Sequence, residues 1–295
     1  MFLKMIKNFS FVLLFFLSNS SQARIEGAVT SATAGSGVAA VDPVDSANLN
    51  PAALAFTRGY VFTSSMTSSK TGSDLTNNGY LLALVDNLPE TVVPTAFAFT
   101  QSTDKFQGEI YHSERDFRLS SGNSINNQWA YGLGVNYKTD EYKTDKRPDI
   151  TKTATQINLH TGVMWTPTKQ TGLGLVFRNF VGPDNSVPDA YRLNPETVFG
   201  YNYNYKKFLR LKADIGTTGA NSFGRPKLGT GMEMYMNRWL VMRMGAGRNM
   251  LENSNAYGVG VGFLGPKFAL NYAFSNDNKD ESLARHTVDL AVPIW

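Results

Sequence analysis

The stretch that decides the fold reads Trp129-Ala-Tyr-Gly-Leu-Gly-Val-Asn-Tyr-Lys138. Every second residue from Trp129 to Tyr137 is aromatic or apolar, and the residues between them are small or polar. Successive side chains of a β-strand point to opposite faces, so this alternation predicts a strand with one apolar face. An apolar face that begins and ends with an aromatic ring is typical of a strand that crosses a membrane, because such rings lie at the two interfaces.

The same alternation recurs along the chain from Gly59 onward, in segments of about ten residues separated by turn-forming clusters. About fourteen such segments can be counted, and an even number is what a single-chain bacterial barrel requires. They are 59–69, 77–86, 93–101, 108–120, 127–138, 152–165, 171–179, 196–205, 208–216, 226–235, 238–248, 255–264, 266–275 and 285–295. We therefore predict an all-β fold, a transmembrane antiparallel β-barrel of about 14 strands.

The lengths of the connections favour this barrel over its main alternative, a soluble β-sandwich. Tight joints alternate with longer polar stretches, the former at 166–170, 206–207, 236–237 and 265, the latter at 139–151, 180–195, 217–225, 249–254 and 276–284. An outer-membrane barrel has short turns on its periplasmic side and longer loops outside the cell. A sandwich would not place Trp and Tyr on a continuous apolar stripe in nearly every strand.

The N-terminus has the parts of a secretory signal peptide. Lys4 and Lys7 precede an apolar run at 9–17, and a small-x-small cleavage site follows at 21–23, so the mature chain would start at Arg24. An uncleaved anchor is the alternative, but the run is too short to span a bilayer as a helix. We predict export through the Sec pathway to the cell outer membrane of a Gram-negative bacterium. The predicted regions are a signal peptide at 1–23, a lumen plug or hatch at 24–58 and the barrel at 59–295.

The composition excludes several kinds of site. The chain has no cysteine, which rules out disulfides, thiolate metal sites and lipid attachment at an N-terminal cysteine. The net charge of +4 is spread along the chain without a basic block, so no nucleic-acid partner is predicted. The three histidines are widely spaced, and we expect no metal and no cofactor.

Residues 24–58 do not alternate and are rich in small side chains. Asn50 suits the N-cap of a short helix and Pro51 its first turn, with Ala52 to Ala55 continuing the helix. Small side chains allow tight packing, so we predict that this segment plugs the lumen. The alternative, an unstructured periplasmic tail, would be more charged and less rich in Ala and Val.

The run from Gly35-Ser-Gly-Val-Ala through Asp42 and Asp45 to Asn50-Pro51-Ala52-Ala53-Leu54 resembles the N-terminal hatch of the FadL-type outer-membrane transporters. The resemblance implies a barrel that takes up long-chain fatty acids or other hydrophobic small molecules passively, by hatch-gated lateral diffusion through a gap in the wall. It also implies that Asn50, Pro51 and Ala52 are the hatch motif. The chain departs from the family in its shorter length and its modest external loops.

Several charged residues point into the lumen if the aromatic faces point outward. Arg210, Lys212 and Asp214 share the inward face of one strand, and Glu233 and Arg243 lie inward on the next two. Unpaired charges in a narrow lumen are costly, so we expect a salt-bridge network between neighbouring strands. The network either fills and stiffens the lumen or offers a cationic spot to a ligand carboxylate, with Arg210 or Arg243 as the clamp.

Two further residues concern the wall and its assembly. Pro94, early in the third predicted strand, is a candidate for a distorted wall, because proline cannot donate to a ladder. The alternative is that Pro94 starts a strand. Trp295 is the terminal aromatic residue that we expect to serve as the signal for the barrel assembly machinery.

No catalytic residue is predicted. An outer-membrane phospholipase needs His and Ser two residues apart on one strand, and His112, His160 and His286 have no such serine. An outer-membrane protease needs His and Asp together, but His286 and Asp289 lie on opposite faces of a strand. We therefore expect a channel for passive uptake of hydrophobic small molecules such as fatty acids, and no enzyme.

The alternatives are a structural or secretion-associated barrel and a small-solute porin. The expected partners are outer-membrane lipid, a hydrophobic ligand and the assembly machinery, and a monomer is the favoured state.

Overall fold

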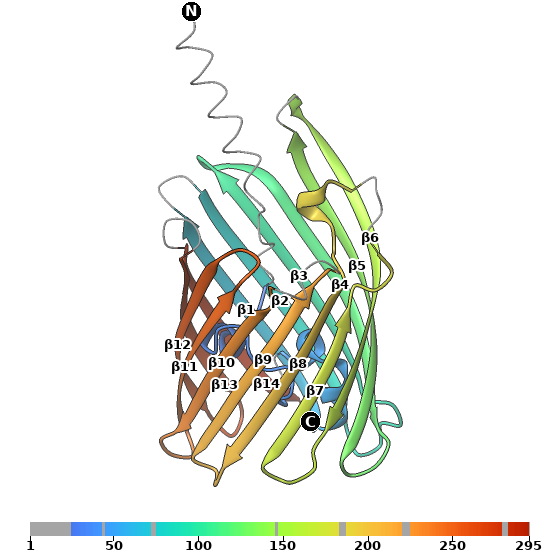
Figure 1. The fold of residues 1–295 in the computed structure, drawn as a ribbon, viewed down its shortest axis with the longest axis vertical. Coiled ribbons are helices and arrows are strands. Elements are labelled where there is room, and N and C mark those ends of the chain that lie inside the picture. The colour runs from blue at the N-terminus through green and yellow to red at the C-terminus, as the bar shows by residue number, and fades with distance from the viewer. Residues whose placement is uncertain are drawn as a thin grey trace, which may run out of the picture.

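The computed structural model describes residues 25–42, 45–71, 75–144, 147–182, 187–219, 225–278 and 283–294. Within these ranges fourteen antiparallel strands close into a barrel (Figure 1). Each strand is hydrogen-bonded to its neighbours in the chain, and the last strand is bonded to the first. The prediction of an all-β antiparallel barrel of about 14 strands is confirmed. No helix in the described ranges is long and apolar enough to cross a bilayer.

Each predicted segment overlaps the strand of the same rank. The strands are β1 Gly59–Thr71, β2 Leu75–Asn87, β3 Thr95–Phe106, β4 Glu109–Ser124, β5 Trp129–Thr144, β6 Arg147–Trp165, β7 Thr171–Arg178, β8 Glu196–Tyr205, β9 Leu209–Thr218, β10 Lys227–Tyr235, β11 Leu240–Asn249, β12 Ser254–Leu264, β13 Ala269–Asp277 and β14 Leu283–Ile294. The helical elements of the described ranges are α2 Ala28–Ala32, α3 Ser46–Leu49, η1 Pro51–Ala55 and η2 Asp189–Tyr191. The predicted signal peptide at 1–23 and the predicted assembly signal at Trp295 lie outside the described residues.

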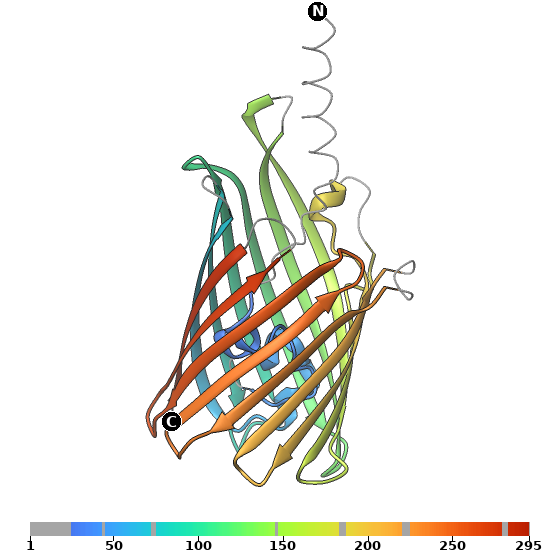
Figure 2. The same cartoon turned by 60° about the vertical axis from the view of Figure 1, so that its left-hand side comes forward.

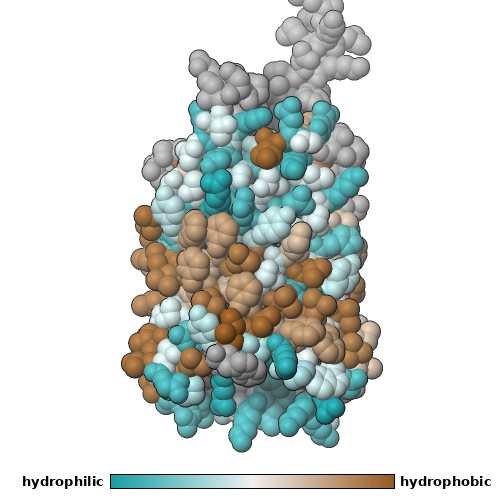
Figure 3. Space-filling view, turned by 180° about the vertical axis from the view of Figure 1, so that it is seen from behind, coloured by the Kyte–Doolittle hydropathy of each residue, from teal (hydrophilic) through white to brown (hydrophobic). Residues whose placement is uncertain are grey.

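The apolar face of the strands lies on the outside of the barrel. On β5 the exposed fraction is 39% for Trp129 and 59% for Leu133, whereas Ala130 on the other face is fully buried. Exposed aromatic and aliphatic side chains form a band between two hydrophilic ends on the face drawn in Figure 3. A soluble protein would bury such a band, so it is the lipid-facing surface of a membrane-spanning barrel.

The hairpin of β5 and β6 is longer than the sequence predicts. We expect 139–151 to be a loop, but β5 continues to Thr144 and β6 begins at Arg147. The two strands stay in register as far as Lys143 and Thr151. Outside the lipid a strand has water on both faces, so polar residues continue the ladder there. The apolar alternation that marks a membrane strand therefore stops before the strand does.

The N-terminal segment lies inside the barrel, in the half that carries the short turns (Figures 1 and 2). We call its described residues, 25–42 and 45–58, the plug. Helix α2 contacts β11 to β14, and η1 contacts β2 and β4 to β6, so the plug touches well-separated parts of the wall. Ala52, Ala53 and Leu54 have no exposed surface.

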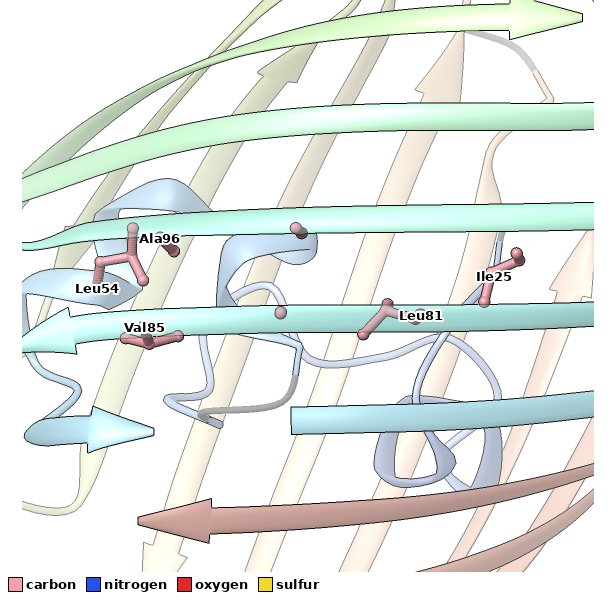
Figure 4. Close-up of a cluster of buried hydrophobic side chains, with 7 residues drawn as sticks. Ile25, Leu54, Leu81, Val85 and Ala96 are labelled. Atoms are coloured by element: carbon pink, nitrogen blue, oxygen red, sulfur yellow. The ribbon is translucent and has the colours of Figure 1, made fainter. Parts of the chain in front are cut away.

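An apolar cluster joins the plug to β2 and β3 (Figure 4). Leu54 of η1 packs near Val85 and Ala96, and Ile25 lies beside Leu81 further along β2. Burying one aliphatic side chain of this size contributes about 1.5–3 kcal/mol. The plug is therefore fixed to this wall by packing of the kind found in a protein core.

Candidate functional site

Glycines line the inner wall of the barrel where the plug packs against it. A Cβ atom built on Gly162 would overlap Oδ1 of Asn50, and one built on Gly132 would overlap the backbone of Pro51 and Ala52. The same crowding by plug atoms occurs at Gly122, Gly174, Gly200, Gly231, Gly245 and Gly258. Only a residue without a side chain leaves room for the plug backbone at these places. We call this set of glycines the plug seat.

The Asn-Pro-Ala motif holds the plug in shape. Asn50 is the N-cap of η1, where its Oδ1 accepts a hydrogen bond from the N–H of Ala52 (3.0 Å). Its Nδ2 donates to the carbonyl of Val38 (2.9 Å), which ties the two halves of the plug together. Pro51 occupies the first turn, where the N–H that it lacks would have had no partner. The role of Asn50, Pro51 and Ala52 as a hatch motif stays a prediction.

Charged side chains of the wall bind the plug backbone. Asp214 of β9 accepts hydrogen bonds from the N–H groups of Gly37 (2.7 Å) and Val38 (3.0 Å). Arg178 of β7 donates to the carbonyl of Leu49 (2.6 Å). A hydrogen bond to a charged group contributes about 1.5–3 kcal/mol, so these two anchors make a large contribution to holding the plug.

Two carboxyl groups meet at the N-terminus of α2. Asp45 of the plug accepts from the N–H of Gly27 (2.9 Å) and the hydroxyl of Thr30 (2.5 Å). Asp289 of β14 accepts from the N–H of Ala28 (2.5 Å). Both side chains are buried. The first N–H groups of a helix have no partner within the helix and attract negative charge, which explains why two acids lie there.

Asp45 titrates close to neutral pH. Burial raises the pKa of its carboxyl to about 6, and the neighbouring charge of Asp42 acts in the same direction. The hydrogen bonds from Thr30 and Gly27 oppose this rise because they favour the ionised form. The charge at this contact between plug and wall therefore changes within the range of pH that a bacterial envelope meets.

Three cations surround Glu233 in the lumen. Its Oε1 lies 2.8 Å from Nζ of Lys212 and 3.4 Å from Nη1 of Arg210, and its Oε2 lies 2.9 Å from Nε of Arg243. The register explains the contact, because Glu233 is directly opposite Arg210 on β9 and Arg243 on β11. Asp214 does not join this group, since its carboxylate binds the plug instead. Four of the five predicted lumen residues therefore form one cluster.

The two predicted clamps, Arg210 and Arg243, differ in whether their guanidinium groups are accessible to a ligand. Arg243 is buried and also donates to Asn271 (2.9 Å), so its guanidinium is enclosed by the cluster. The Arg210 side chain is 23% exposed and lines a cavity of about 460 Å³ at the short-turn end. Phe56 of the plug and Met164 of β6 also line this cavity. Of the two arginines, only Arg210 therefore places its positive charge beside a cavity that apolar side chains also line.

No protein-family model matches the chain, and no curated protein sequence matches it. Solved structures do match. The CymD monoaromatic hydrocarbon channel superposes with a TM-score of 0.73 at 13% identity, over 91% of this chain and 97% of that one. The toluene transporter TbuX of Ralstonia pickettii gives 0.73 at 12% identity, over 93% and 100%. A FadL homologue of Pseudomonas aeruginosa gives 0.62 at 12% identity, over 91% and 98%.

The chain has the FadL-type barrel fold. At these identities the likeness is one of fold, and it extends over nearly the whole described chain. The fold implied by the resemblance of the Gly35–Leu54 run is therefore confirmed.

The wall of this FadL-type barrel is regular at Pro94. Pro94 lies one residue before β3, and its carbonyl accepts a hydrogen bond from Gly122 (3.1 Å). Thr95 is paired with Asp86 on one side and Ser121 on the other, and no shift of register follows nearby. The prediction of a distorted wall at Pro94 is wrong within the described strands. The proline starts the strand, where its missing N–H breaks no ladder.

The ladder of the wall is incomplete between β6 and β7 instead. β6 has nineteen residues and β7 eight, and their pairing stops at His160 and Arg178. Beyond this point the segment after β7 bridges the wall through side chains: Gln156 donates to the carbonyl of Tyr191 (2.9 Å) and accepts from the N–H of Leu193 (3.1 Å). We call this place the β6–β7 seam. Sequence reasoning missed it, because the alternation along β6 does not show that its neighbour β7 ends earlier.

A second charged cluster lies on β4 and β5. The imidazole of His112 contacts Asp104 (2.8 Å) and Asp140 (3.1 Å), and Lys138 lies 3.2 Å from both Asp140 and Glu114. Donor atoms of His112, Glu114 and Asp140 come within 4.8 Å of one another, the spacing of metal ligands. Lys138 already supplies a positive charge at this place. The cluster was also missed, although the spacing of two in 112/114 and 138/140 puts each pair on one strand face.

The histidine nearest to an aspartate in the sequence does not form a catalytic pair with it. His286 is exposed on the outer surface, where its Nδ1 contacts the hydroxyl of Tyr272 (2.8 Å). Asp289 is buried against the plug on the inner face. The two side chains therefore lie on opposite faces of β14, as the parity of their positions requires.

Proposed function

We propose that this protein is an outer-membrane channel for the passive uptake of hydrophobic small molecules. The observation that carries the proposal is the fold, which is that of channels named for monoaromatic hydrocarbons and toluene, together with a plug packed into the lumen. By the same analogy the substrates are compounds such as fatty acids or monoaromatic hydrocarbons. A small-solute porin would need an open aqueous path, whereas here the plug packs against the inner wall on several sides in the short-turn half of the lumen.

The plug directs a ligand sideways. A compound that enters from the outside meets the plug before it reaches the periplasmic end, so the plug obstructs the direct exit. At the β6–β7 seam the ladder ends, and beyond one backbone bond from Phe180 to Leu159 (3.5 Å) the described contacts are made through side chains such as that of Gln156. An apolar cluster of Tyr142, Ala154, Val187 and Tyr191 lies there. Lateral diffusion, with the plug as the hatch, therefore uses the seam, and not the wall at Pro94.

Arg210 offers a clamp for acidic ligands only on a second route, past the plug to the short-turn end, because its cavity lies beyond the β6–β7 seam on the way in. Its guanidinium borders a cavity that Val41, Phe56 and Met164 also line, a combination that suits a carboxylate attached to an apolar body. Arg210→Ala should reduce uptake of a fatty acid and leave uptake of toluene unchanged. Equal uptake of both by the variant and the parent protein would remove the clamp from the proposal.

The central test is uptake by proteoliposomes that contain the full mature chain. Labelled oleate and labelled toluene should enter faster than into empty liposomes, without a steady ion conductance. Steady conductance without uptake of either compound would identify a porin. No uptake and no conductance would identify a structural or secretion-associated barrel.

The seam can be tested separately, because the chain has no native cysteine. Gln156→Cys with Leu193→Cys should crosslink the seam when oxidised, block uptake, and release it again on reduction. Lys143→Cys with Thr151→Cys, two partners in the β5–β6 hairpin, is the matched control and should leave uptake unchanged. Full uptake with the seam crosslinked would place the route elsewhere.

A further inference from the structure

The short-turn end of the barrel is basic. Among the described connecting residues there, Glu90 is the one acid, and the exposed cations are Arg58, Lys169, Lys206, Lys207, Arg238 and Lys267. The described connections at the opposite end carry Asp189 and Glu252 against Arg192 and Arg225. Clusters of Lys and Arg beside a membrane attract anionic lipid headgroups. Among the described connections, an excess of positive charge therefore marks the short-turn end.

Three of these cations surround one hollow. A cavity of about 430 Å³ lies between the β8–β9 turn and the β10–β11 turn, lined by Lys206, Lys207, Phe208, Tyr235, Asn237 and Arg238. The N–H of Tyr235 donates to the carbonyl of Phe208 (2.8 Å), which keeps the two turns side by side. None of the ion pairs in the described ranges involves the three cations of this hollow.

Aromatic rings place the hollow at the edge of the lipid. Nζ of Lys206 lies 5.2 Å from the ring centre of Tyr205, and the guanidinium of Arg238 lies 4.6 Å from that of Trp239. The ring of Phe208 is 53% exposed. Aromatic side chains of membrane barrels gather at the level of the headgroups. The three cations therefore lie where the phosphates of a lipid leaflet are found.

The backbone of the β8–β9 turn supports a role for its two lysines. Lys206 and Lys207 both have positive φ, 53° and 63°, and the N–H of Phe208 donates to the carbonyl of Tyr205 (3.1 Å). These are the features of a type I′ turn, for which Asn-Gly is the favoured sequence. A residue with a Cβ atom is strained in this conformation, and Asn tolerates it because its short polar side chain can hydrogen-bond locally. Lys206 and Lys207 thus occupy two positions where Asn and Gly would be less strained. Strained residues are often found at functional sites, so we infer that these lysines have a function.

We propose that this hollow binds the phosphate headgroup of an anionic phospholipid in the periplasmic leaflet of the outer membrane. Ammonium and guanidinium groups form charge-assisted hydrogen bonds with phosphate oxygens, and Asn237 offers an amide beside them. The exposed side chains of Met236 and Leu240 continue from the hollow along the lipid-facing surface, where the acyl chains would lie. Through Tyr235, whose hydroxyl donates to Glu233 (3.5 Å), the hollow adjoins the charged cluster of the lumen.

The test measures binding of a soluble short-chain lipid to the full mature chain in detergent. Dihexanoyl-phosphatidylglycerol should bind more tightly than dihexanoyl-phosphatidylcholine, as followed by native mass spectrometry. The triple variant K206N/K207G/R238Q should weaken phosphatidylglycerol binding about tenfold to a hundredfold, since each cation near the phosphate adds to the attraction. Because Asn-Gly is the favoured turn sequence, this variant should fold at least as well as the parent protein, which its melting temperature checks.

The matched control removes three cations from the same end outside the hollow, in R58Q/K169Q/K267Q, and should change the affinity less than twofold. Equal weakening in the two variants would overturn the site in favour of diffuse charge attraction. Equal binding of the two lipids would overturn the assignment of an anionic headgroup. Displacement of the lipid by an equal concentration of inorganic phosphate would reassign the hollow to free phosphate.

Discussion

A single methyl group at the plug seat should release the plug. In Gly162→Ala the new Cβ overlaps Oδ1 of Asn50, so the amide has to leave its place. Asn50 then loses its hydrogen bonds to Ala52 and Val38, at about 1 kcal/mol each. Overpacking by one methyl group costs a further 1–3 kcal/mol, roughly. Alanine in place of glycine favours the strand equally whether the plug is seated or not, so this gain does not change the balance, and about 3–5 kcal/mol acts against the seated plug. At 1.4 kcal/mol per factor of ten, the unseated fraction rises by roughly 100- to 4000-fold.

A cysteine in place of Ala53 reports this fraction. Ala53 is fully buried in η1, and the chain has no other cysteine, so Ala53→Cys reacts with a maleimide reagent only when η1 leaves its seat. The labelling rate should therefore rise with the unseated fraction when Gly162→Ala is added. Gly216→Ala is the matched control, because the nearest atoms to its Cβ belong to Val198 and Thr197 of the wall. A labelling rate that stays within twofold of the parent, in a barrel that is still folded, would refute this account of the seat.

The buried charges give three further predictions. Glu233→Gln leaves three cations around a neutral amide and should lower the free energy of unfolding by about 3–5 kcal/mol, measured by thermal or denaturant unfolding. A loss below 1 kcal/mol would mean that the cations do not depend on Glu233. Asp214→Asn removes a charged acceptor from two N–H groups of the plug and should speed labelling of the Ala53→Cys thiol at least tenfold, with the barrel unfolding at an unchanged temperature. Asp45 has a pKa of about 6 in the folded protein against 3.8 unperturbed, so the plug is most stable below about pH 4 and loses up to about 3 kcal/mol as pH rises through 6. Protection of the Ala53→Cys thiol from maleimide should therefore fall between about pH 4 and pH 6. The labelling rate is normalised to that of a cysteine in place of the exposed Gln107. An identical fall in Asp45→Asn would assign the effect to another group.

The sequence predicts the wall well because a membrane strand repeats one local rule. The alternation from Trp129 to Tyr137 sets which residues face lipid, and parity alone then places Arg210 and Glu233 in the lumen. The strands β10 and β11 are joined by a short turn and have little freedom of register, so Glu233 faces Arg243 as expected. Arg210 lies across the longer connection between β9 and β10, where parity gives its face and the structure gives its register.

Contacts between the plug and the wall are not local and leave no such pattern. Nothing in the alternation tells that Asp214 binds the plug while Lys212, on the same strand face, binds Glu233. Asp289 was considered only beside His286, whereas in the structure it binds the N–H of Ala28, which is far away in the chain. Such partners depend on how the plug is oriented in the barrel, and a period of two carries no information about that.

The size of the inward residues does carry information about depth, and this bears on the route of a ligand. On β5 the inward face reads Gly132 and Gly134 near the short turns, then Lys138 and Asp140 towards the outside. On β5, glycine marks the level of the plug, and charge marks the lumen above it. The charges above the plug pair with one another, as Lys138 does with Asp140, and they cluster on β3 to β5. Desolvating such a wall is costly, whereas the cluster that includes Val187 at the β6–β7 seam is apolar. The two clusters adjoin, because the ring of Tyr191 at the seam stacks on the imidazole of His112. We therefore expect an apolar ligand above the plug to bind on the seam side of this boundary, beyond the end of the ladder between β6 and β7.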